Sequence, residues 1–383
     1  MLKLNDHIEV QIEKMANEGK GLARYQKQVV FVPLSAPGDF LKVKIVKINK
    51  NFLEAEIVEI IQPSQLRITP PCGYYSQCGG CNFQHIKYEE QLKLKTQLVK
   101  ETLSKFLKTD ELPFKESVAS PKPFHYRNRV QLHSENGEFG FYKRQSHQLL
   151  PITECLIAEE ELNSYLKQLK HDTPNFKNDR IELFLDKTLS ANHRYLSEKS
   201  NVGLFSQVNR FQNAHLIKAV IDNYNQLKSP VIFDLFAGSG NFTFPLQKTN
   251  SAAKIYGVEL SSALVKQAKS EITADHSINK NISFIESSVE RFLQQYKIGP
   301  DDFILLDPPR TGCHPEVMYQ LGSSKKNQIV YISCNYITLA RDLAVLQQTA
   351  QNWKLALNIQ KIQCFDMFPQ TDHIEVLVSF SVS

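Results

Sequence analysis

Short apolar segments alternate with longer amphipathic ones through the last part of the chain, and this pattern constrains the fold more than any other feature. The apolar segments are Val231 to Phe236, Lys254 to Val258, Ile282 to Ile285, Phe303 to Leu306 and Gln328 to Ile332. Apolar strands that alternate with helices form a parallel sheet with helices on its faces. With a helix expected over Ala214 to Leu227, we predict a Rossmann-like, doubly wound α/β domain over residues 208–383.

The first of these strands runs into a glycine turn of the kind that binds nucleotides. Gly238 and Gly240 let the backbone approach a ligand closely. Position 243 is Thr where a dinucleotide-binding turn has a third glycine, and Asp234 places a carboxylate four residues before Gly238. A carboxylate there suits the amino group of a cationic ligand better than a pyrophosphate. We therefore expect S-adenosylmethionine rather than NAD, with Phe236 among the donor-binding residues.

Glu259 ends the next predicted strand, at the place where an acidic residue pairs with ribose hydroxyls in such folds. Taken alone, Glu259 would be an ordinary surface carboxylate. Its place at the end of a predicted strand favours a donor-binding role.

Asp307 and Arg310 lie in Leu306-Asp307-Pro308-Pro309-Arg310, at the predicted end of the fourth strand, where such sheets bind their substrates. Amino-group methyltransferases usually have an aromatic residue at the position of Arg310. RNA cytosine-5 enzymes tend to carry a cysteine in this segment, where this chain has prolines. Methylation of an exocyclic amine or of cytosine is therefore less favoured.

Cys334 and Glu375 complete a set of groups that suits methylation of a pyrimidine carbon. Carbon 5 of uracil is a poor nucleophile, so a thiolate must first add to carbon 6, and a base must later remove the C5 proton. We predict that Cys334 is the nucleophile and Glu375 the base. Asp307 could accept the N3 hydrogen of uracil, and Arg310 could bind phosphate or lower the pKa of the thiol.

Taken singly, a Cys after an apolar strand is usually a buried hydrophobe, and a Glu in a strand is usually an exposed partner of the alternation. By that logic His373, Cys313 and Cys364 are expected to be structural. The occurrence of Asp307, Cys334 and Glu375 on one predicted sheet edge favours catalysis for those three.

The first 62 residues alternate as short strands do, so we predict a small, OB-like β-barrel over residues 1–62. The expected strands are His7 to Ile12, Gln28 to Val32, Leu41 to Val46 and Phe52 to Val58. Turns are expected at Gly19, Gly21, Pro33, Pro37 and Gly38.

Residues 63–207 are expected to form a central α+β domain. A helix over 88–106 carries leucines on one side and lysines on the other, and we expect it to pack on the catalytic domain. Strands are expected at Val130 to His133, Gly137 to Tyr142 and Ile181 to Leu185. The segment His125 to Arg129 offers aromatic and cationic groups for RNA contact, although a solvated strand edge is an equal alternative.

Three of the seven cysteines crowd together in the central region. Cys72 and Cys78 are separated by five residues and Cys78 and Cys81 by two, and Cys155 offers a fourth thiol. Four thiolates suit an iron-sulfur cluster or a structural zinc, and spacing alone does not choose between them.

Several of these motifs resemble one family. The segments Asp234 to Gly240, Asp307 to Gly312, Ser333 to Asn335 and Asp366 to Glu375 look like those of the RNA (uracil-5-)-methyltransferases, over nearly the whole chain. The resemblance implies that Cys334 is the nucleophile and Glu375 the base. Phe205 to Asn209 matches a further motif of that family, which places Gln207 at the substrate and donor site.

The barrel and the cysteines also resemble one branch of that family. Gly19 to Arg24, followed by Val30 to Pro33, is similar to the RNA-binding TRAM domain. Three close cysteines and a distant fourth resemble the ligands of the ribosomal-RNA branch. This implies a [4Fe-4S] cluster on Cys72, Cys78, Cys81 and Cys155, and 23S ribosomal RNA rather than transfer RNA as substrate.

Composition adds little to these predictions. A formal charge of +5 permits a polyanionic partner without requiring one. We expect a cytoplasmic monomer with no membrane segment. The alternatives are the same chemistry on a transfer RNA uridine, N-methylation with Asp307 as acceptor, and a non-catalytic iron-sulfur protein that binds RNA.

Overall fold

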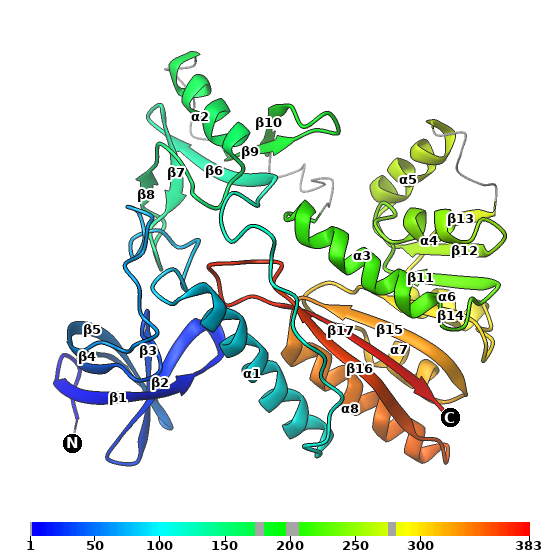
Figure 1. Ribbon diagram of the computed structural model, residues 1–383, viewed down its shortest axis with the longest axis horizontal. Coiled ribbons are helices and arrows are strands. Elements are labelled where there is room, and N and C mark those ends of the chain that lie inside the picture. Colours follow the sequence, from blue (N-terminus) through cyan, green and yellow to red (C-terminus); the bar gives the residue numbers. More distant parts are fainter. Residues whose placement is uncertain (1, 173–179, 197–206, 275–280) are drawn as a thin grey trace. The chain divides into compact units, whose positions relative to one another are not determined.

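The structure is a computed structural model that describes residues 2–172, 180–196, 207–274 and 281–383. The chain forms two compact units (Figure 1). The first consists of residues 1–98, 121–201 and 368–372, and the second of residues 99–120, 202–367 and 373–383. None of the described helices is long and apolar enough to cross a membrane.

The first unit begins with a closed five-stranded barrel, which confirms the predicted N-terminal fold. Its strands are β1 (His7–Met15), β2 (Lys20–Tyr25), β3 (Gln28–Pro33), β4 (Phe40–Ile48) and β5 (Phe52–Gln62), in the order β1-β2-β3-β5-β4. Alternate residues of these strands point inward and form one apolar core, because successive side chains of a strand lie on opposite faces.

Gly21 was predicted to form a turn, and this is wrong, because it lies inside β2 opposite Val32. A Cβ at Gly21 would come within 2.1 Å of Ser35 Oγ and 2.8 Å of Ile12 Cγ2. The position therefore needs a glycine for space within a strand. Gly19 does form a turn before β2, with φ at +65°.

The central region is a second antiparallel sheet, in agreement with the predicted α+β domain. Its strands are β6 (Arg129–Glu135), β7 (Glu138–Tyr142), β8 (Leu149–Pro151), β9 (Arg180–Leu185) and β10 (Ala191–Leu196), in the order β10-β9-β6-β7-β8. Helix α2 (Glu160–Asp172) packs on this sheet through Leu162, Leu166 and Leu169.

Helix α1 (Tyr88–Leu107) is present where the sequence predicts a helix. Residues 88–98 of this helix belong to the first unit, and residues 99–107 belong to the second. Its packing on the catalytic domain stays a prediction.

The second unit contains a seven-stranded sheet in the order β13-β12-β11-β14-β15-β17-β16. The strands are β11 (Val231–Leu235), β12 (Lys254–Glu259), β13 (Ile282–Glu286), β14 (Phe303–Leu306), β15 (Lys326–Ser333), β16 (Leu357–Phe365) and β17 (Glu375–Val382). Helix α3 (Arg210–Tyr224) precedes these strands, and the helices between them are α4 (Thr243–Thr249), α5 (Ser262–Ala274), α6 (Val289–Gln295), α7 (Pro315–Gly322) and α8 (Tyr336–Asn352).

This sheet confirms the methyltransferase-type fold but is not parallel throughout. The five predicted strands are parallel neighbours, whereas β17 runs antiparallel to both β15 and β16. The chain order reverses between β11 and β14, and such switch points are where open α/β sheets bind ligands beyond the carboxyl ends of the strands.

A short segment before the central sheet borders the outer strand β16. The backbone N–H of Lys115 donates to Ile362 O at 2.8 Å, and the N–H of Val118 donates to Cys364 O at 2.8 Å. Phe114 and Val118 form parallel bridges to this strand. Residues 113–118 therefore satisfy backbone groups that an open edge would expose.

Candidate active site and cysteine pocket

The turn after β11 has the backbone conformation that a closely bound ligand requires. Phe236, Gly238 and Gly240 have φ values of +70°, +57° and +99°, in the left-handed region that favours glycine. A Cβ added at Gly238 would meet no atom within 4 Å. The turn therefore has open space on the side where a ligand can approach its backbone.

Asp234 carries an unused hydrogen-bond acceptor beneath this turn. Its side chain is fully buried, and its Oδ2 accepts a hydrogen bond from Thr243 Oγ1 at 2.5 Å. Burial raises the pKa of Asp234 to about 6, although the bond from Thr243 opposes the rise. Its Oδ1 is buried without a hydrogen-bond partner among the described residues. A buried acceptor of this kind suits a donor brought by a ligand, such as an ammonium group.

Glu259 is tied to the same turn. Its Oε2 accepts from the backbone N–H of Gly238 at 3.0 Å, and its Oε1 accepts from that of Ser261 at 2.7 Å. A carboxylate has about four lone-pair sites, so these two bonds leave capacity for ribose hydroxyls.

Strand register brings Asp307, Cys334 and Glu375 to one edge of the sheet. Asp307 and Cys334 follow the parallel strands β14 and β15. Glu375 begins β17, which is antiparallel to β15 with Ser333 opposite Val376. Cys334 directly follows Ser333, and Glu375 directly precedes Val376. The pairing of Ser333 with Val376 therefore brings Cys334 and Glu375 together.

The electrostatics show that these groups interact. The pKa of the Cys334 thiol is raised to about 11: burial and the charge of Glu375 raise it, and the hydrogen-bonded Arg310 guanidinium opposes the rise. Burial also raises the pKa of Glu375 well above its ordinary value, and Asp307 adds to that rise. The pKa of Asp307 is raised to about 8, first by burial and then by Asp234. The thiol, Arg310 and the two acids thus form one cluster.

The loop that carries Asp307 and Arg310 is fastened to α8. The buried Oδ2 of Asp342 accepts from the backbone N–H of Cys313 at 2.7 Å and from the Tyr331 hydroxyl at 2.6 Å. Arg341 pairs with Asp342 at 2.7 Å and donates to Thr311 O at 2.8 Å. One carboxylate therefore holds together the loop, the strand β15 and the helix α8.

Two residues at the start of α8 bind the same loop. Asn335 Nδ2 and Thr338 Oγ1 donate to Arg310 O at 3.0 and 3.2 Å. Gly312, with φ at +78°, leaves no room for a Cβ, which would lie 2.5 Å from an Asp342 carboxylate oxygen. The backbone beside Arg310 is thereby held close to the residue that follows Cys334.

Gln207 is half-buried just before α3. Phe205 and Ser206 of the same motif lie outside the described residues. The placement of Gln207 at the donor site stays a prediction.

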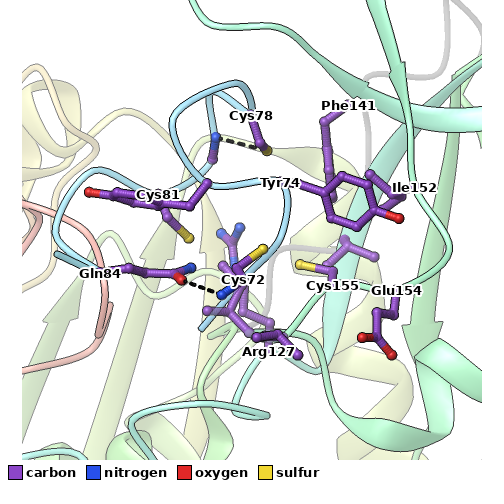
Figure 2. Close-up of a pocket in the computed structure, with 15 residues that line it drawn as sticks. Cys72, Tyr74, Cys78, Cys81, Gln84, Arg127, Phe141, Ile152, Glu154 and Cys155 are labelled. Atoms are coloured by element: carbon purple, nitrogen blue, oxygen red, sulfur yellow. Dashed lines mark hydrogen bonds between the residues drawn. The ribbon is translucent and has the colours of Figure 1, made fainter. Parts of the chain in front are cut away.

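All four predicted cluster cysteines line one cavity of about 50 Å³ in the first unit. Figure 2 shows Cys72, Cys78, Cys81 and Cys155 around this cavity. Its other lining residues include the apolar side chains of Val130, Phe141, Ile152, Leu156 and Ile157. Gly80 N–H donates to the Cys78 sulfur at 3.4 Å. Cys155 thus lies at the same cavity as the three cysteines that are close in sequence, and their role as cluster ligands stays a prediction.

The thiols are close enough to influence one another. Burial raises the pKa of Cys81 to about 12, Gln84 opposes the rise, and the other three thiols add to it. Burial also raises the pKa of Cys155 to about 11, whereas the charge of Arg127 lowers it. No three His, Cys, Asp or Glu side chains in the described part of the chain lie at the spacing that suits a single metal ion.

Two arginines support the cavity. Arg127 lines it, and the Nε of this residue is buried without a hydrogen-bond partner among the described residues (Figure 2). Arg144 Nη2 donates to Cys81 O at 2.8 Å and fixes the backbone of the cysteine loop. A guanidinium with a buried, unpartnered Nε suits a site that holds an anionic group.

The segment His125 to Arg129 contains one residue, Tyr126, that cannot offer its side chain to RNA. Tyr126 is fully buried, and its hydroxyl donates to Pro369 O at 3.0 Å within the first unit. Arg127 is occupied in the cysteine cavity. Tyr126 is therefore not available to RNA, whereas RNA contact by the rest of the segment His125 to Arg129 stays a prediction.

Sequence reasoning missed the supporting residues Asp342, Arg127 and Gln84. Asp342 lies in an amphipathic helix, where a charged residue is normally exposed. Gln84 Oε1 accepts from the N–H of Cys72 at 3.3 Å, and nothing in the local sequence indicates this bond. The only available signal was the proximity of Gln84 to the cysteines in sequence.

Comparison with known proteins agrees with this geometry. Residues 175–382 match the family model described as tRNA (Uracil-5-)-methyltransferase, and residues 3–58 match the TRAM domain. The chain is 39% identical over 382 residues to an uncharacterized RNA methyltransferase of Bdellovibrio bacteriovorus, covering 99% of this chain and 96% of the relative. It is 30% identical to one from Thermotoga maritima, with 97% and 98% covered.

Among solved structures, the chain is similar to the Pyrococcus abyssi tRNA (uracil-54, C5)-methyltransferase in complex with S-adenosyl-L-homocysteine. The TM-score is 0.75 at 22% identity, with 97% of this chain and 100% of that chain covered. At this identity the similarity shows the fold. The family match over more than half of the chain shows more: the protein belongs to the RNA (uracil-5-)-methyltransferases, enzymes that use S-adenosylmethionine to methylate carbon 5 of uracil in RNA, and carries an N-terminal TRAM domain.

Proposed function

We propose that this protein methylates carbon 5 of one uridine in 23S ribosomal RNA, with Cys334 as nucleophile and Glu375 as base. The observation that carries the catalytic assignment is the pairing of Ser333 with Val376, which brings the two reactive residues together beside Asp307. The family match supports the reaction.

The chemistry begins at the thiol. The Cys334 thiolate forms a bond to carbon 6 of uracil, and the electron pair of the C5–C6 double bond moves toward O4 as an enolate. S-adenosylmethionine supplies the methyl group that carbon 5 takes up. Glu375 then removes the proton from carbon 5, the double bond re-forms, and the C6–S bond breaks to return the thiolate.

The neighbouring groups suit the other requirements of this reaction. The Arg310 guanidinium favours the thiolate form of Cys334, which is the reactive form. The raised pKa of Glu375 makes its carboxylate a stronger base than an exposed glutamate. Asp307 can accept the N3 hydrogen of uracil, which cytosine does not carry.

The donor site is assigned to residues around the turn after β11. The free Oδ1 of Asp234 suits the donor's amino group, Glu259 suits its ribose, and the open face at Gly238 leaves room for the ligand. We place Phe236, Gly240, Asp307 and Gln207 in the same site.

The cysteine cavity fits a [4Fe-4S] cluster held by Cys72, Cys78, Cys81 and Cys155. Four thiols surround a mostly apolar cavity, and the buried, unpartnered Nε of Arg127 suits the negative charge of a cluster bound by four thiolates. We propose that the cluster orders the loop rather than reacting. The resemblance of this cysteine set to the ribosomal-RNA branch is the ground for choosing 23S ribosomal RNA.

A transfer RNA uridine is the second candidate, because the matching family model and the similar solved structure both carry names of transfer RNA enzymes. Mass spectrometry of nucleosides decides between the two. Unmodified 23S ribosomal RNA and transfer RNA are each incubated with the protein and S-adenosylmethionine, beside Cys334→Ala. We expect 5-methyluridine in the ribosomal RNA only, and none with Cys334→Ala.

The other outcomes are equally informative. Product in transfer RNA alone would replace the proposed substrate and leave the chemistry intact. Product at another atom, or activity that survives Cys334→Ala, would overturn the thiolate mechanism. Cluster content is measured separately by iron and sulfide analysis of anaerobically purified protein, where about four of each per chain is expected.

A further inference from the structure

The loop that carries the clustered cysteines is hydrogen-bonded to a short segment, residues 368–372, that precedes the proposed base Glu375. Asn82 directly follows Cys81, and its Nδ2 donates to Asp372 Oδ1 at 2.9 Å. In return, the backbone N–H of Asp372 donates to Asn82 Oδ1 at 2.9 Å. Both residues belong to the first unit, and together they form a reciprocal pair that holds the backbone and the side chain of Asp372.

A second reciprocal pair lies two residues earlier. Gln91 Nε2 donates to Gln370 Oε1 at 2.9 Å, and the backbone N–H of Gln370 donates to Gln91 Oε1 at 3.0 Å. The carbonyl of Gln370 accepts from the backbone N–H groups of Asn82 and Phe83 at 3.2 and 3.0 Å. Gln370 is buried and has φ at +69°, a conformation that needs such support in a residue other than glycine.

Glu375 lies three residues beyond Asp372 and is the first residue of β17. The ends of strands open more readily than their centres, so a base at a strand terminus needs a fixed lead-in. Only His373 and Ile374 separate the tethered Asp372 from Glu375. Ordering the backbone at residues 370–372 therefore restricts the conformations open to the base.

We propose that Asn82 and Asp372 are positioning residues for Glu375: the cysteine loop holds the lead-in segment, residues 368–372, and thereby keeps the base in place for removal of the C5 proton. This inference rests on the proposed role of Glu375. In this proposal the cysteine site contributes to catalysis by positioning the base, which requires no electron transfer.

The proposal predicts a defect in one step. Thiol addition and methyl transfer do not use the base, so they should proceed normally when the lead-in segment is loosened. Proton removal should slow, and the methylated RNA should remain bonded to Cys334. This covalent adduct survives denaturing electrophoresis, which makes it measurable by a method other than turnover.

The variants are Asp372→Ala, which loses the acceptor for Asn82 Nδ2, and Asp372→Asn, which keeps an oxygen at that position. Glu375→Gln serves as the reference for a missing base. In single-turnover reactions we expect Asp372→Ala to form the adduct at the wild-type rate and to resolve it at least about tenfold more slowly. Asp372→Asn should resolve it at nearly the wild-type rate. Affinity for S-adenosylmethionine should be unchanged in both.

Asn82→Asp provides a second test in case Asp372→Ala does not fold. It keeps the shape of the side chain but replaces the donating amide with a carboxylate facing Asp372, so it should also accumulate adduct. Far-ultraviolet circular dichroism checks that each variant is folded.

Three results would overturn the inference. One is that Asp372→Ala and Asn82→Asp resolve the adduct at the wild-type rate while Glu375→Gln does not. Another is that adduct formation falls in parallel with its resolution, which indicates a general structural role. A third is that Asp372→Asn behaves like Asp372→Ala. If Glu375→Gln itself accumulates no adduct, the role of the base fails, and the positioning proposal fails with it.

Discussion

Cys334 is surrounded by opposing charges, and their balance controls how much reactive thiolate it forms. Burial and Glu375 raise the pKa of the thiol to about 11, while Arg310 lowers it. At neutral pH the thiol form therefore predominates in the free enzyme. Each unit of pH below the pKa changes the thiolate fraction about tenfold.

Replacing Arg310 by Gln should raise the pKa of Cys334 further and shift the pH profile of adduct formation to higher pH. The expected result is a loss of rate by the same factor from about pH 7 to about pH 9, because both values lie well below the pKa of about 11, and a smaller loss as the pH approaches that pKa. Arg310→Lys keeps the positive charge, so its rate of adduct formation should lie between those of the wild type and Arg310→Gln. Single-turnover rates across this range measure the effect. A loss that stays the same as the pH approaches about 11 would contradict it and indicate a role in RNA binding alone.

How far the site could be predicted depends on the kind of residue. Cys334 and Glu375 could be proposed as nucleophile and base because the chemistry of uracil requires both and the motifs contain both, and the pairing of Ser333 with Val376 brings the two residues together; their roles stay predictions. The residues that support them could not be predicted, because the hydrogen bonds of Asp342, and those between Asn82 and Asp372, join residues far apart in sequence. Such contacts depend on tertiary packing, which one sequence does not display.

At the scale of elements, one buried carboxylate contributes to the contact between the loop after β14 and the helix α8. Asp342→Ala would leave the N–H of Cys313 and the hydroxyl of Tyr331 without their acceptor, and Arg341 without its partner. We expect a loss of about 3 kcal/mol in the free energy of unfolding. Tyr331→Phe, which removes one hydrogen bond, should cost about 1 kcal/mol. Urea unfolding measures both, and equal losses would argue against Asp342 as the shared acceptor.

The barrel also has a buried charge at its base. Asp39 is fully buried and accepts hydrogen bonds from Arg67 Nε at 2.7 Å, Ala36 N at 2.6 Å and Ser64 N at 2.9 Å. Burial alone would raise the pKa of Asp39, but Arg67 and the backbone donors together lower it below its ordinary 3.8. The carboxylate therefore stabilises the barrel above that value and loses this effect as the pH falls through its folded pKa.

Asp39→Asn should lower the melting temperature at pH 7, because an amide cannot accept from all of these donors. The difference from wild type should shrink as the pH falls below about 3.8, where the carboxyl becomes protonated in the unfolded chain, and should be smallest below the lower pKa of the folded carboxyl. Thermal melting at the two pH values tests this. Since Ser64 and Arg67 take part, the contacts of the barrel extend past the predicted boundary at residue 62.

The elements were predictable where hydrophobic periodicity was strong. The five strands from β11 to β15 follow from apolar runs between helices, and four barrel strands follow from alternation. Strand β2 was missed because its glycine indicates a turn in isolation, and β16 and β17 were missed because no helix follows them. An antiparallel addition to a parallel sheet has no local signature of its own.

At the scale of the whole molecule, neither unit is a continuous piece of chain. The sequence passes between them five times, at residues 98, 120, 201, 367 and 372. A fragment that begins at residue 208 therefore lacks residues 113–118, which border β16 in the second unit.

We expect the fragment 208–383 to melt at a lower temperature than the full chain or to aggregate, because the edge of β16 becomes unpaired and Gln212 Nε2 loses its bond of 2.7 Å to Val118 O. A synthetic peptide of residues 108–120 added to the fragment should raise its melting temperature, and a scrambled peptide should not. A fragment as stable as the full chain would show that this border is dispensable.

Because the two units are interleaved in sequence, their segments are synthesised in alternation. The ribosome makes residues 368–372, which close the first unit beside the cysteines, only after residues 202–367 of the second unit. During translation the cysteine loop is therefore complete in sequence before residues 368–372, which bond to it, have been made. Until Gln370 and Asp372 have been made, their hydrogen bonds to Asn82 and Phe83 cannot form, so the loop that follows Cys81 gains these bonds only late in synthesis.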